Sequence, residues 1–261
     1  MAIDCQAKLA VEAVTVRFEQ TLALAETSLK IERCEFVSIV GPSGCGKSTL
    51  FNAISGLVPP TTGRVLVDGK DVTGSTGHVG YMLQKDLLIP WRTVVGNIVV
   101  GAALTRRVTA DDKQEARALA RRYGLGEFLD HYPHALSGGM RQRVALMRTL
   151  AVHTDVMLLD EPFGALDSQT RLSMQQWLLE VWSDTGRTVL FVTHDVDEAI
   201  FLADRVVVMT PRPGKISTVL SVRLERPRDL ECLTSPEFMT IKKEILSLLY
   251  QSGSPQGAQP R

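Results

Sequence analysis

The stretch Gly41-Pro42-Ser43-Gly44-Cys45-Gly46-Lys47-Ser48-Thr49 decides the fold of this chain. It lies between an apolar run, residues 35–40, and a helical pattern that begins at Leu50. Its glycines allow the positive φ angles at which successive backbone N–H groups point at one anion, and the following helix directs the positive end of its dipole to the same place. Lys47 is expected to reach the β- and γ-phosphates of a nucleotide, and the Ser48 hydroxyl to bind Mg²⁺. The sequence therefore predicts a strand, a phosphate-binding loop and a helix, rather than a glycine-rich turn before an ordinary helix.

The composition is that of an ordinary globular protein with one large domain. The chain has 261 residues, of which 44% are hydrophobic and 22% charged, enough to bury a core without disulfides or metals. Lys and Arg together number 29, as do Asp and Glu, so the formal net charge is zero. Such a chain has no overall positive field to attract nucleic acid or anionic lipid, which leaves only a local basic patch as a route to such partners.

The cysteines show no pairing or metal-binding pattern. They are widely scattered and lack C-x-x-C spacing: Cys5, Cys34, Cys45 and Cys232. A disulfide at Cys45 would block the phosphate loop, which favours a reducing cytosol. The N-terminus lacks the charged and apolar regions of a signal peptide, and no run approaches the roughly 18 apolar residues that a membrane span needs.

Two further apolar runs end in side chains suited to nucleotide chemistry. Residues 156–159 precede Asp160 and Glu161, and residues 189–193 precede His194. Parallel strands deliver their carboxyl ends to one ligand crevice. We expect Asp160 to hold Mg²⁺, Glu161 to polarise a water for attack on the γ-phosphate, and His194 to contact that phosphate and the carboxylate. The alternatives are a surface charge pair and a structural histidine.

A second candidate anion site lies at Ser137-Gly138-Gly139, which opens a helical pattern over residues 138–148. A serine followed by two glycines leaves backbone donors uncovered at a helix start. The alternative interpretation is a flexible hinge before the helix.

The remaining segments predict a small antiparallel layer, a helical region and a C-terminal helix. Strand-like runs occur at 9–18, 22–24, 28–31, 63–70 and 78–84, and a closing hairpin at 205–220. Helical patterns occur between 93 and 149, with an amphipathic helix at 111–123, and again at 168–184 and 236–250. Phe18 could stack on a base or belong to the core. The apolar, proline-containing segment 85–91 is either a partner surface or a loop folded back onto the core.

Taken together, these motifs resemble the ATP-binding subunit of an ABC transporter. The resemblance covers nearly the whole chain. It comprises the Walker A motif at 41–49, the Q-loop at Gln84, an LSGGQ-type signature at 136–142, the Walker B strand at 156–161, the D-loop at 165–167 and the switch histidine His194. Met140 stands where many members have Gln, and Cys34 where a Gly usually precedes the Glu, which affects the local turn geometry. Residues 87–93, 192–199 and 209–214 look like the nitrate/sulfonate/taurine branch of bacterial importers.

The resemblance implies an α/β fold: a P-loop NTPase core with a mostly parallel sheet, an antiparallel β subdomain and a helical signature subdomain. It places the ATPase domain at 1–220, with the helical subdomain inserted at about 92–153, a C-terminal helical extension at 221–250 and a disordered tail at 251–261. The implied catalytic residues are Glu161, His194 and Gln84. The implied ATP-binding residues are Phe18, Gly41, Pro42, Ser43, Gly44, Cys45, Gly46, Lys47, Ser48, Thr49, Ser137, Gly138, Gly139 and Asp167. The implied Mg²⁺ ligands are Ser48, Gln84 and Asp160.

The resemblance also implies partners. Two copies would pack head to tail as a homodimer around two ATP molecules. The dimer would lie beneath integral membrane permease subunits, at the cytoplasmic face of the bacterial inner membrane. An extracytoplasmic solute-binding protein would be an indirect partner, and no nucleic acid is expected to bind. The rival interpretation is a soluble ABC-type ATPase acting on DNA or ribosomes, which would usually carry a long coiled-coil insertion or two cassettes; a plain P-loop kinase would leave the signature unexplained. The last helix is left open as either regulatory or simply packed on the core.

Overall fold

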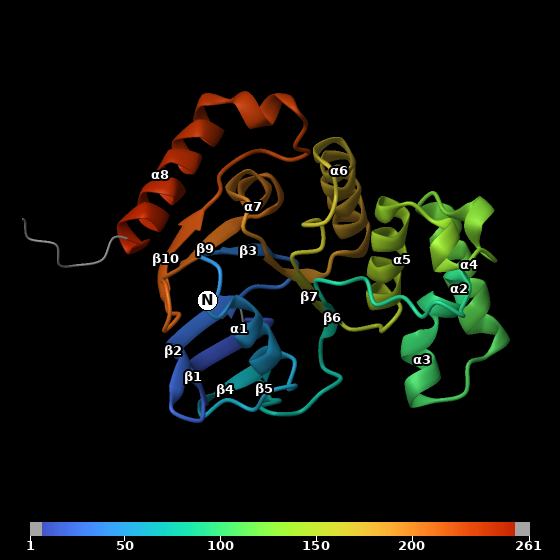
Figure 1. Ribbon diagram of the computed structural model, residues 1–261, viewed down its shortest axis with the longest axis horizontal. Coiled ribbons are helices and arrows are strands. Elements are labelled where there is room, and N and C mark those ends of the chain that lie inside the picture. Colours follow the sequence, from blue (N-terminus) through green and yellow to red (C-terminus); the bar gives the residue numbers. More distant parts are fainter. Residues whose placement is uncertain (1–6, 254–261) are drawn as a thin grey trace, which may run out of the picture.

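The computed structural model describes residues 7–253 and centres on a six-stranded, mostly parallel sheet (Figure 1). The strand order is β10-β9-β3-β8-β7-β6. The bounds are β3 (Phe36–Val40), β6 (Gly80–Met82), β7 (Val156–Asp160), β8 (Thr188–Val192), β9 (Arg205–Met209) and β10 (Ile216–Ser221). β3, β7 and β8 are buried at every residue, which explains their continuous apolar runs. β10 is antiparallel to β9, so the predicted closing hairpin is confirmed.

A second, antiparallel sheet of order β2-β1-β4-β5 lies against the first. Its strands are β1 (Leu9–Phe18), β2 (Thr21–Ile31), β4 (Thr62–Val67) and β5 (Lys70–Asp71). The predicted antiparallel layer is confirmed, but β2 is continuous where the sequence suggested two pieces. β6 is shorter than the predicted strand 78–84, so Gln84 lies beyond its end.

The parallel sheet is covered on both faces, and alternate residues of β3 show this directly. Val37 and Ile39 face the core shared with the antiparallel sheet and α1 (Lys47–Ile54). Phe36 and Val40 face a larger core formed with the helices. On this second face lie α6 (Ser168–Thr185), α7 (Val196–Leu202) and α8 (Pro236–Gly253) (Figure 1).

A helical arm stands beside the β6 edge of the sheet (Figure 1). It contains α2 (Val94–Ile98), α3 (Val100–Thr105), α4 (Ala110–Arg122) and α5 (Gly138–Leu150), with short 3-10 turns at Gly126–Phe128 and Pro133–Ala135. The predicted amphipathic helix 111–123 is α4, which starts at a capping box between Thr109 and Asp112.

The C-terminal part differs from the prediction at one boundary. A 3-10 turn, Glu231–Thr234, leads into α8, which continues to Gly253. Residues 251–253 are therefore helical although they were predicted to belong to a disordered tail, and the rest of that predicted tail lies outside the described residues. Within residues 7–253, none of the helices combines the length and apolarity needed to cross a membrane.

Candidate nucleotide site

The predicted strand, loop and helix are present between β3 and α1. Gly44 and Gly46 have φ of 74° and 105°, in the left-handed region that favours glycine. Gly46 is the N-cap of α1, so the loop delivers its backbone to a helix N-terminus. This arrangement suits a bound phosphate group because the helix dipole and free N–H groups converge there.

Lys47 lies at the centre of this loop. Its side chain is buried, and Nζ donates to the carbonyl oxygens of Gly41 and Pro42 at 2.8 and 3.1 Å. The Cys45 thiol lies 3.9 Å from the same Nζ and is fully buried. The backbone carbonyls of the loop thus hold the ammonium group of Lys47 in place.

The loop borders a hollow of about 390 Å³. The lining residues are Phe18, Ala23, Ser43, Gly44, Gly46, Lys47, Ser48, Thr49, Gln84, Glu161 and Arg212. Most of the predicted Walker A residues therefore face one space. Gly41, Pro42 and Cys45 are not among the lining residues and support the loop from the protein side.

Phe18 lies at the end of β1 on the rim of this hollow. The residue is 46% exposed, which rules out the alternative that it belongs to the core. An exposed ring beside a phosphate loop is available to stack on a nucleotide base.

The predicted catalytic residues come together at the carboxyl ends of β6, β7 and β8. Glu161 Oε2 accepts a hydrogen bond from Gln84 Nε2 at 3.1 Å and lies 3.3 Å from His194 Nδ1. The three strands are adjacent and parallel, so the residues that follow them meet at the same edge. The surface-charge alternative for Glu161 therefore does not describe its surroundings.

Asp160 is 6% exposed at the end of β7, with the Tyr81 hydroxyl 3.4 Å from its Oδ2. Burial raises the pKa of the Asp160 carboxyl, and the neighbouring Glu161 acts in the same direction, whereas a hydrogen bond from Ser48 opposes them. A buried carboxylate beside a serine hydroxyl is a donor set that suits Mg²⁺. Within the described residues, no group of three or more His, Cys, Asp or Glu could hold a metal ion.

Sequence reasoning missed Arg212, which lines the hollow from the loop between β9 and β10. That loop is attached to β2: the Ala25 N–H donates to the Gly214 carbonyl at 2.8 Å, and the Gly214 N–H donates to Ala23 at 3.2 Å. The hairpin could be predicted from its turn residues, but the strand that its loop contacts could not. Tyr81 was also missed, although it lies in β6 only three residues before the Q-loop residue Gln84.

The Ser137-Gly138-Gly139 loop and Asp167 do not line this hollow. Ser137 and Asp167 cap α5 and α6, accepting hydrogen bonds from the N–H groups of Met140 and Thr170. A Cβ at Gly139 would lie 3.0 Å from Thr170 Cγ2, so the two helix starts pack closely together. The structure thus joins the signature to the D-loop but separates both from Lys47.

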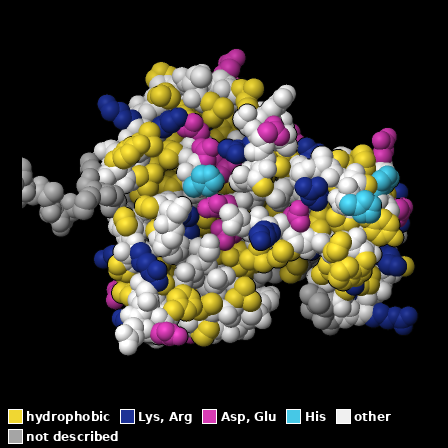
Figure 2. Space-filling model, viewed as in Figure 1, with side chains coloured by type: hydrophobic (Ala, Val, Ile, Leu, Met, Phe, Trp, Pro, Cys, Tyr) yellow, Lys and Arg dark blue, Asp and Glu magenta, His cyan; other side chains and the backbone are white. Residues whose placement is uncertain are grey.

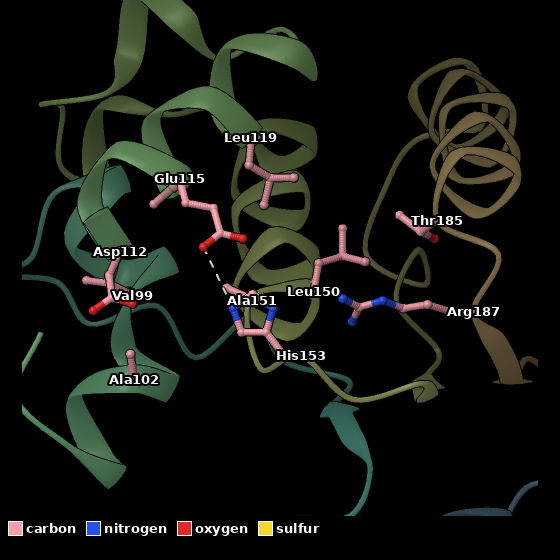
Figure 3. A pocket seen from close by; sticks show the side chains of 11 residues that line it. Val99, Ala102, Asp112, Glu115, Leu119, Leu150, Ala151, His153, Thr185 and Arg187 are labelled. Atoms are coloured by element: carbon pink, nitrogen blue, oxygen red, sulfur yellow. Dashed lines mark ion pairs between the residues drawn. The ribbon is translucent and has the colours of Figure 1, made fainter. Parts of the chain in front are cut away.

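A more enclosed hollow of about 110 Å³ lies between the helical arm and the start of β8 (Figure 3). Its walls are largely aliphatic, and at its rim His153 Nε2 lies 3.8 Å from Glu115 Oε2. Arg187 points toward Leu150 from the other side (Figure 3). None of the predicted phosphate-binding residues lines it, so the hollow around Lys47 is the candidate nucleotide site.

In Figure 2, cationic, acidic and histidine side chains gather near the centre of the displayed face.

Residues 24–164, more than half of the chain, match the ABC transporter family. The chain belongs to this family. It is an ATP-binding subunit of the ABC transporter type and an ATPase. Named relatives extend the match beyond this region. An uncharacterised ABC transporter ATP-binding protein of Methanocaldococcus jannaschii is 47% identical over 246 residues, which cover 93% of this chain and 91% of the relative.

Relatives of the ATPase subunit include taurine import ATP-binding proteins. That of Rhizobium johnstonii is 40% identical and the match covers 90% of this chain and 92% of the relative. That of Yersinia pestis is 39% identical, with 93% and 97% covered. The predicted resemblance to the taurine-containing importer branch is thereby confirmed.

Solved structures of ABC cassettes share the fold of the ATPase subunit. A dimeric bacterial ABC transporter cassette matches with a TM-score of 0.72 and 31% identity, covering 83% of this chain and all of that one. The same TM-score, identity and coverage are found for a dimeric post-hydrolysis cassette bound to ADP and Pi. The cbiO1 protein of Clostridium perfringens, part of the cbiONQ transporter complex, matches with a TM-score of 0.76 and 26% identity, covering 94% and 98%. The predicted α/β fold class is confirmed.

Proposed function

We propose that this ATPase drives uptake of a small solute, such as nitrate, a sulfonate or taurine, in a bacterial importer. Support comes from the relatives named taurine import ATP-binding proteins, which match over almost the full length of the chain. The resemblance of residues 87–93, 192–199 and 209–214 to this importer branch points the same way.

The single observation that carries the proposed chemistry is the convergence of Gln84 and His194 on one oxygen of Glu161. The Glu161 carboxylate would polarise a water for attack on the γ-phosphate held by Lys47. Gln84 and His194 would orient that carboxylate and contact the water and the γ-phosphate. Positioning and charge stabilisation account for most of the catalysis in phosphoryl transfer, so this arrangement suits the reaction.

Ser48, Asp160 and Gln84 would hold Mg²⁺ beside the phosphates. When bound, the ion supplies positive charge that offsets the negative charge of the β- and γ-phosphate oxygens. The burial of Asp160 supports this role, because a buried carboxylate is costly without a cation nearby. Phe18 would stack on the base at the other end of the hollow.

Each complete site would need two copies of the chain. In one copy, Ser137, Gly138, Gly139 and Asp167 lie away from the hollow around Lys47. A second copy in head-to-tail arrangement would bring its signature loop over the γ-phosphate, with the N-terminus of α5 directed at the anion. The dimeric form of a cassette with 31% identity supports this arrangement. ATP would then hold the homodimer closed until hydrolysis releases it.

The proposed partners are two integral membrane permease subunits at the cytoplasmic face of the inner membrane, served by an extracytoplasmic solute-binding protein. Exposed Leu87 and Trp91 offer an apolar contact for a permease. The rival interpretation, action on DNA or ribosomes, is not favoured. In the described residues between α1 and β7, the longest helices have only 13 residues, and the net charge is zero.

The Glu161→Gln variant tests the catalytic proposal. We expect ATP binding to persist and turnover to fall roughly 10²–10⁴-fold, because glutamine keeps the shape and removes the base. Turnover is measured by phosphate release and binding by a fluorescent ATP analogue, with exposed Glu127→Gln as the matched control. Undiminished hydrolysis in Glu161→Gln would show that another group activates the water.

A further inference from the structure

The C-terminal extension, which in the structure covers residues 222–253 after the end of β10, contributes no group to the proposed chemistry. It packs on the larger core through Phe238 and Ile245, which are 1% and 0% exposed. It also contacts α7, the short helix that begins two residues after His194. Figure 1 shows α8 and α7 on the same face of the sheet. The extension is therefore one helix away from the contact between His194 and Glu161.

Two arginines of the extension bond the C-terminal end of α7. Arg228 is 6% exposed, and its Nη1 lies 2.8 to 2.9 Å from three backbone carbonyl oxygens, those of Ile200, Phe201 and Ala203. Arg226 Nη2 donates to the Leu202 carbonyl at 2.7 Å. The last carbonyls of a helix have no partners within the helix, and its dipole favours cations there. Burial lowers the pKa of Arg228 to about 10, so the guanidinium stays charged at neutral pH.

A lysine of the extension holds the opposite end of α7. Lys242 Nζ lies 2.7 Å from Asp197 Oδ1 and 2.8 Å from Oδ2. Asp197 is in the first turn of α7, directly after the N-cap Asp195 and Val196. The extension thus contacts both ends of α7 by charged groups.

The first turn of α7 is in turn bonded to the backbone around His194. Glu198, which is 4% exposed, accepts a hydrogen bond from Gln175 Nε2 at 3.0 Å and another from the Thr193 hydroxyl. That hydroxyl also accepts from the Asp195 N–H at 3.0 Å. The residues on both sides of His194 are therefore fixed to α7.

The position of the His194 imidazole depends on these hydrogen bonds between α7 and the backbone around it. The His194 side chain is 58% exposed, so packing around the ring constrains it little. Its 3.3 Å separation from Glu161 Oε2 therefore depends on the position of its backbone, and a displacement of α7 by about 1 Å is expected to alter that contact.

We infer that the C-terminal extension is a positioning element for His194, in which Arg226, Arg228 and Lys242 hold α7 so that the imidazole stays beside Glu161. The inference rests on the proposed role of His194 in ATP hydrolysis. The last helix thus does more than pack on the core, because a helix that only completes the core would not need charged contacts at both ends of α7.

Lys242→Met in the full chain tests the inference, since this partly exposed residue can change without opening the core. We expect kcat to fall roughly two- to fivefold with KM for ATP unchanged, whereas loss of this partly exposed ion pair should lower the melting temperature only slightly. Lys242→Arg should restore most of the rate. The matched control is Lys243→Met, an exposed position on the same helix. Arg228→Lys, which keeps the charge but has fewer donors, should act in the same direction.

Two readouts separate positioning from a general structural effect. First, Lys242→Met should have no further effect on kcat in a His194→Ala background. Second, the chain has five histidines, so its imidazole NMR spectrum is simple, and Lys242→Met should move the His194 signals alone. An equal loss of rate with and without His194, or wild-type kcat with unmoved His194 signals, would overturn the inference. Wild-type turnover in His194→Ala would overturn it together with the proposed role of His194, and so distinguishes the two failures.

Discussion

At the scale of single residues, Glu161 depends on its backbone as much as on its neighbours. Its φ is 45°, in the left-handed region that costs a non-glycine residue about 1–3 kcal/mol. Its N–H donates to the Val192 carbonyl at 2.9 Å, and its own carbonyl accepts from Gly164 at 3.2 Å. This backbone turns the side chain out of the strand direction at the point where it meets Gln84 and His194. The strain is thus located at the proposed reaction centre.

A second residue-scale constraint is Gly214, which lies against the phosphate loop. A Cβ at this position would be 1.7 Å from the Cys45 carbonyl oxygen, a backbone atom that cannot move without moving the loop. We expect Gly214→Ala to weaken ATP binding at least tenfold and to destabilise the protein by about 1–3 kcal/mol, the usual cost of overpacking. Isothermal titration with ATP and urea unfolding measure the two effects.

The control for this prediction is Gly126→Ala, where the nearest heavy atom to an added Cβ is Arg121 Cγ at 3.4 Å, an ordinary contact. Wild-type affinity in Gly214→Ala would mean that the loop between β9 and β10 can move away from the phosphate loop without cost.

At the scale of elements, the segment between β6 and α2 divides its apolar residues between core and solvent. Leu88 is 9% exposed and belongs to the core, whereas Leu87 and Trp91 are 54% and 77% exposed. Asn97 fixes the segment by accepting from the Ile89 N–H at 2.7 Å and donating to the carbonyls of Ile89, Arg92 and Thr93. The core interpretation therefore holds for Leu88, which must be removed from the predicted partner surface, whereas for the exposed Leu87 and Trp91 the partner surface stays a prediction.

Substitutions in this segment should separate docking from folding. Trp91→Ser should leave the basal ATPase activity of the isolated subunit and its stability unchanged but reduce co-purification with membrane subunits, because it removes an exposed apolar contact. Leu88→Ser should instead cost about 2–5 kcal/mol of unfolding free energy through a core cavity. Affinity capture from detergent-solubilised membranes and thermal unfolding give the two readouts. Full capture of Trp91→Ser would place permease docking elsewhere.

At the scale of the whole molecule, the arrangement of motifs divides the proposed site between two copies. The Walker A, Walker B, Q-loop and switch residues gather around Lys47 and Glu161, whereas the signature and D-loop form a separate surface at the starts of α5 and α6. The α5 N-terminus starts at the exposed Ser137 and has no acidic residue in its first turn, so its helix dipole favours an anion supplied from outside the chain.

Complementation tests this division. Lys47→Ala should abolish nucleotide binding by the phosphate loop of its own copy. Gly138→Asp should place a carboxylate where the γ-phosphate bound by the partner copy would lie. A carboxylate at a helix N-terminus does not destabilise the helix. Each variant alone should be inactive. When the two variants are mixed in equal amounts and their subunits exchange between dimers, up to about a quarter of wild-type ATPase activity should return. Half of the dimers are then mixed, and each mixed dimer has one intact site of two. Activity of Gly138→Asp alone would indicate that one chain suffices.

The sequence by itself determined the class of the fold and most of the residues that line the candidate nucleotide site. The glycine spacing and Lys47 specify a phosphate loop through local backbone geometry. The apolar runs before Asp160 and His194 indicate buried parallel strands, because a strand covered on both faces needs no polar positions. Both signals are local, and the structure confirms the fold that they predict.

Only the tertiary structure decided which distant segments meet. The loop carrying Arg212 reaches the hollow because Gly214 bonds to β2, and the exposure of Phe18 and burial of Leu88 depend on how the two sheets and the helical arm pack. The link from Lys242 through α7 to His194 likewise joins residues whose spacing in sequence carries no pattern. Local propensity and periodicity describe neighbours along the chain, whereas these contacts are fixed by the packing of whole elements.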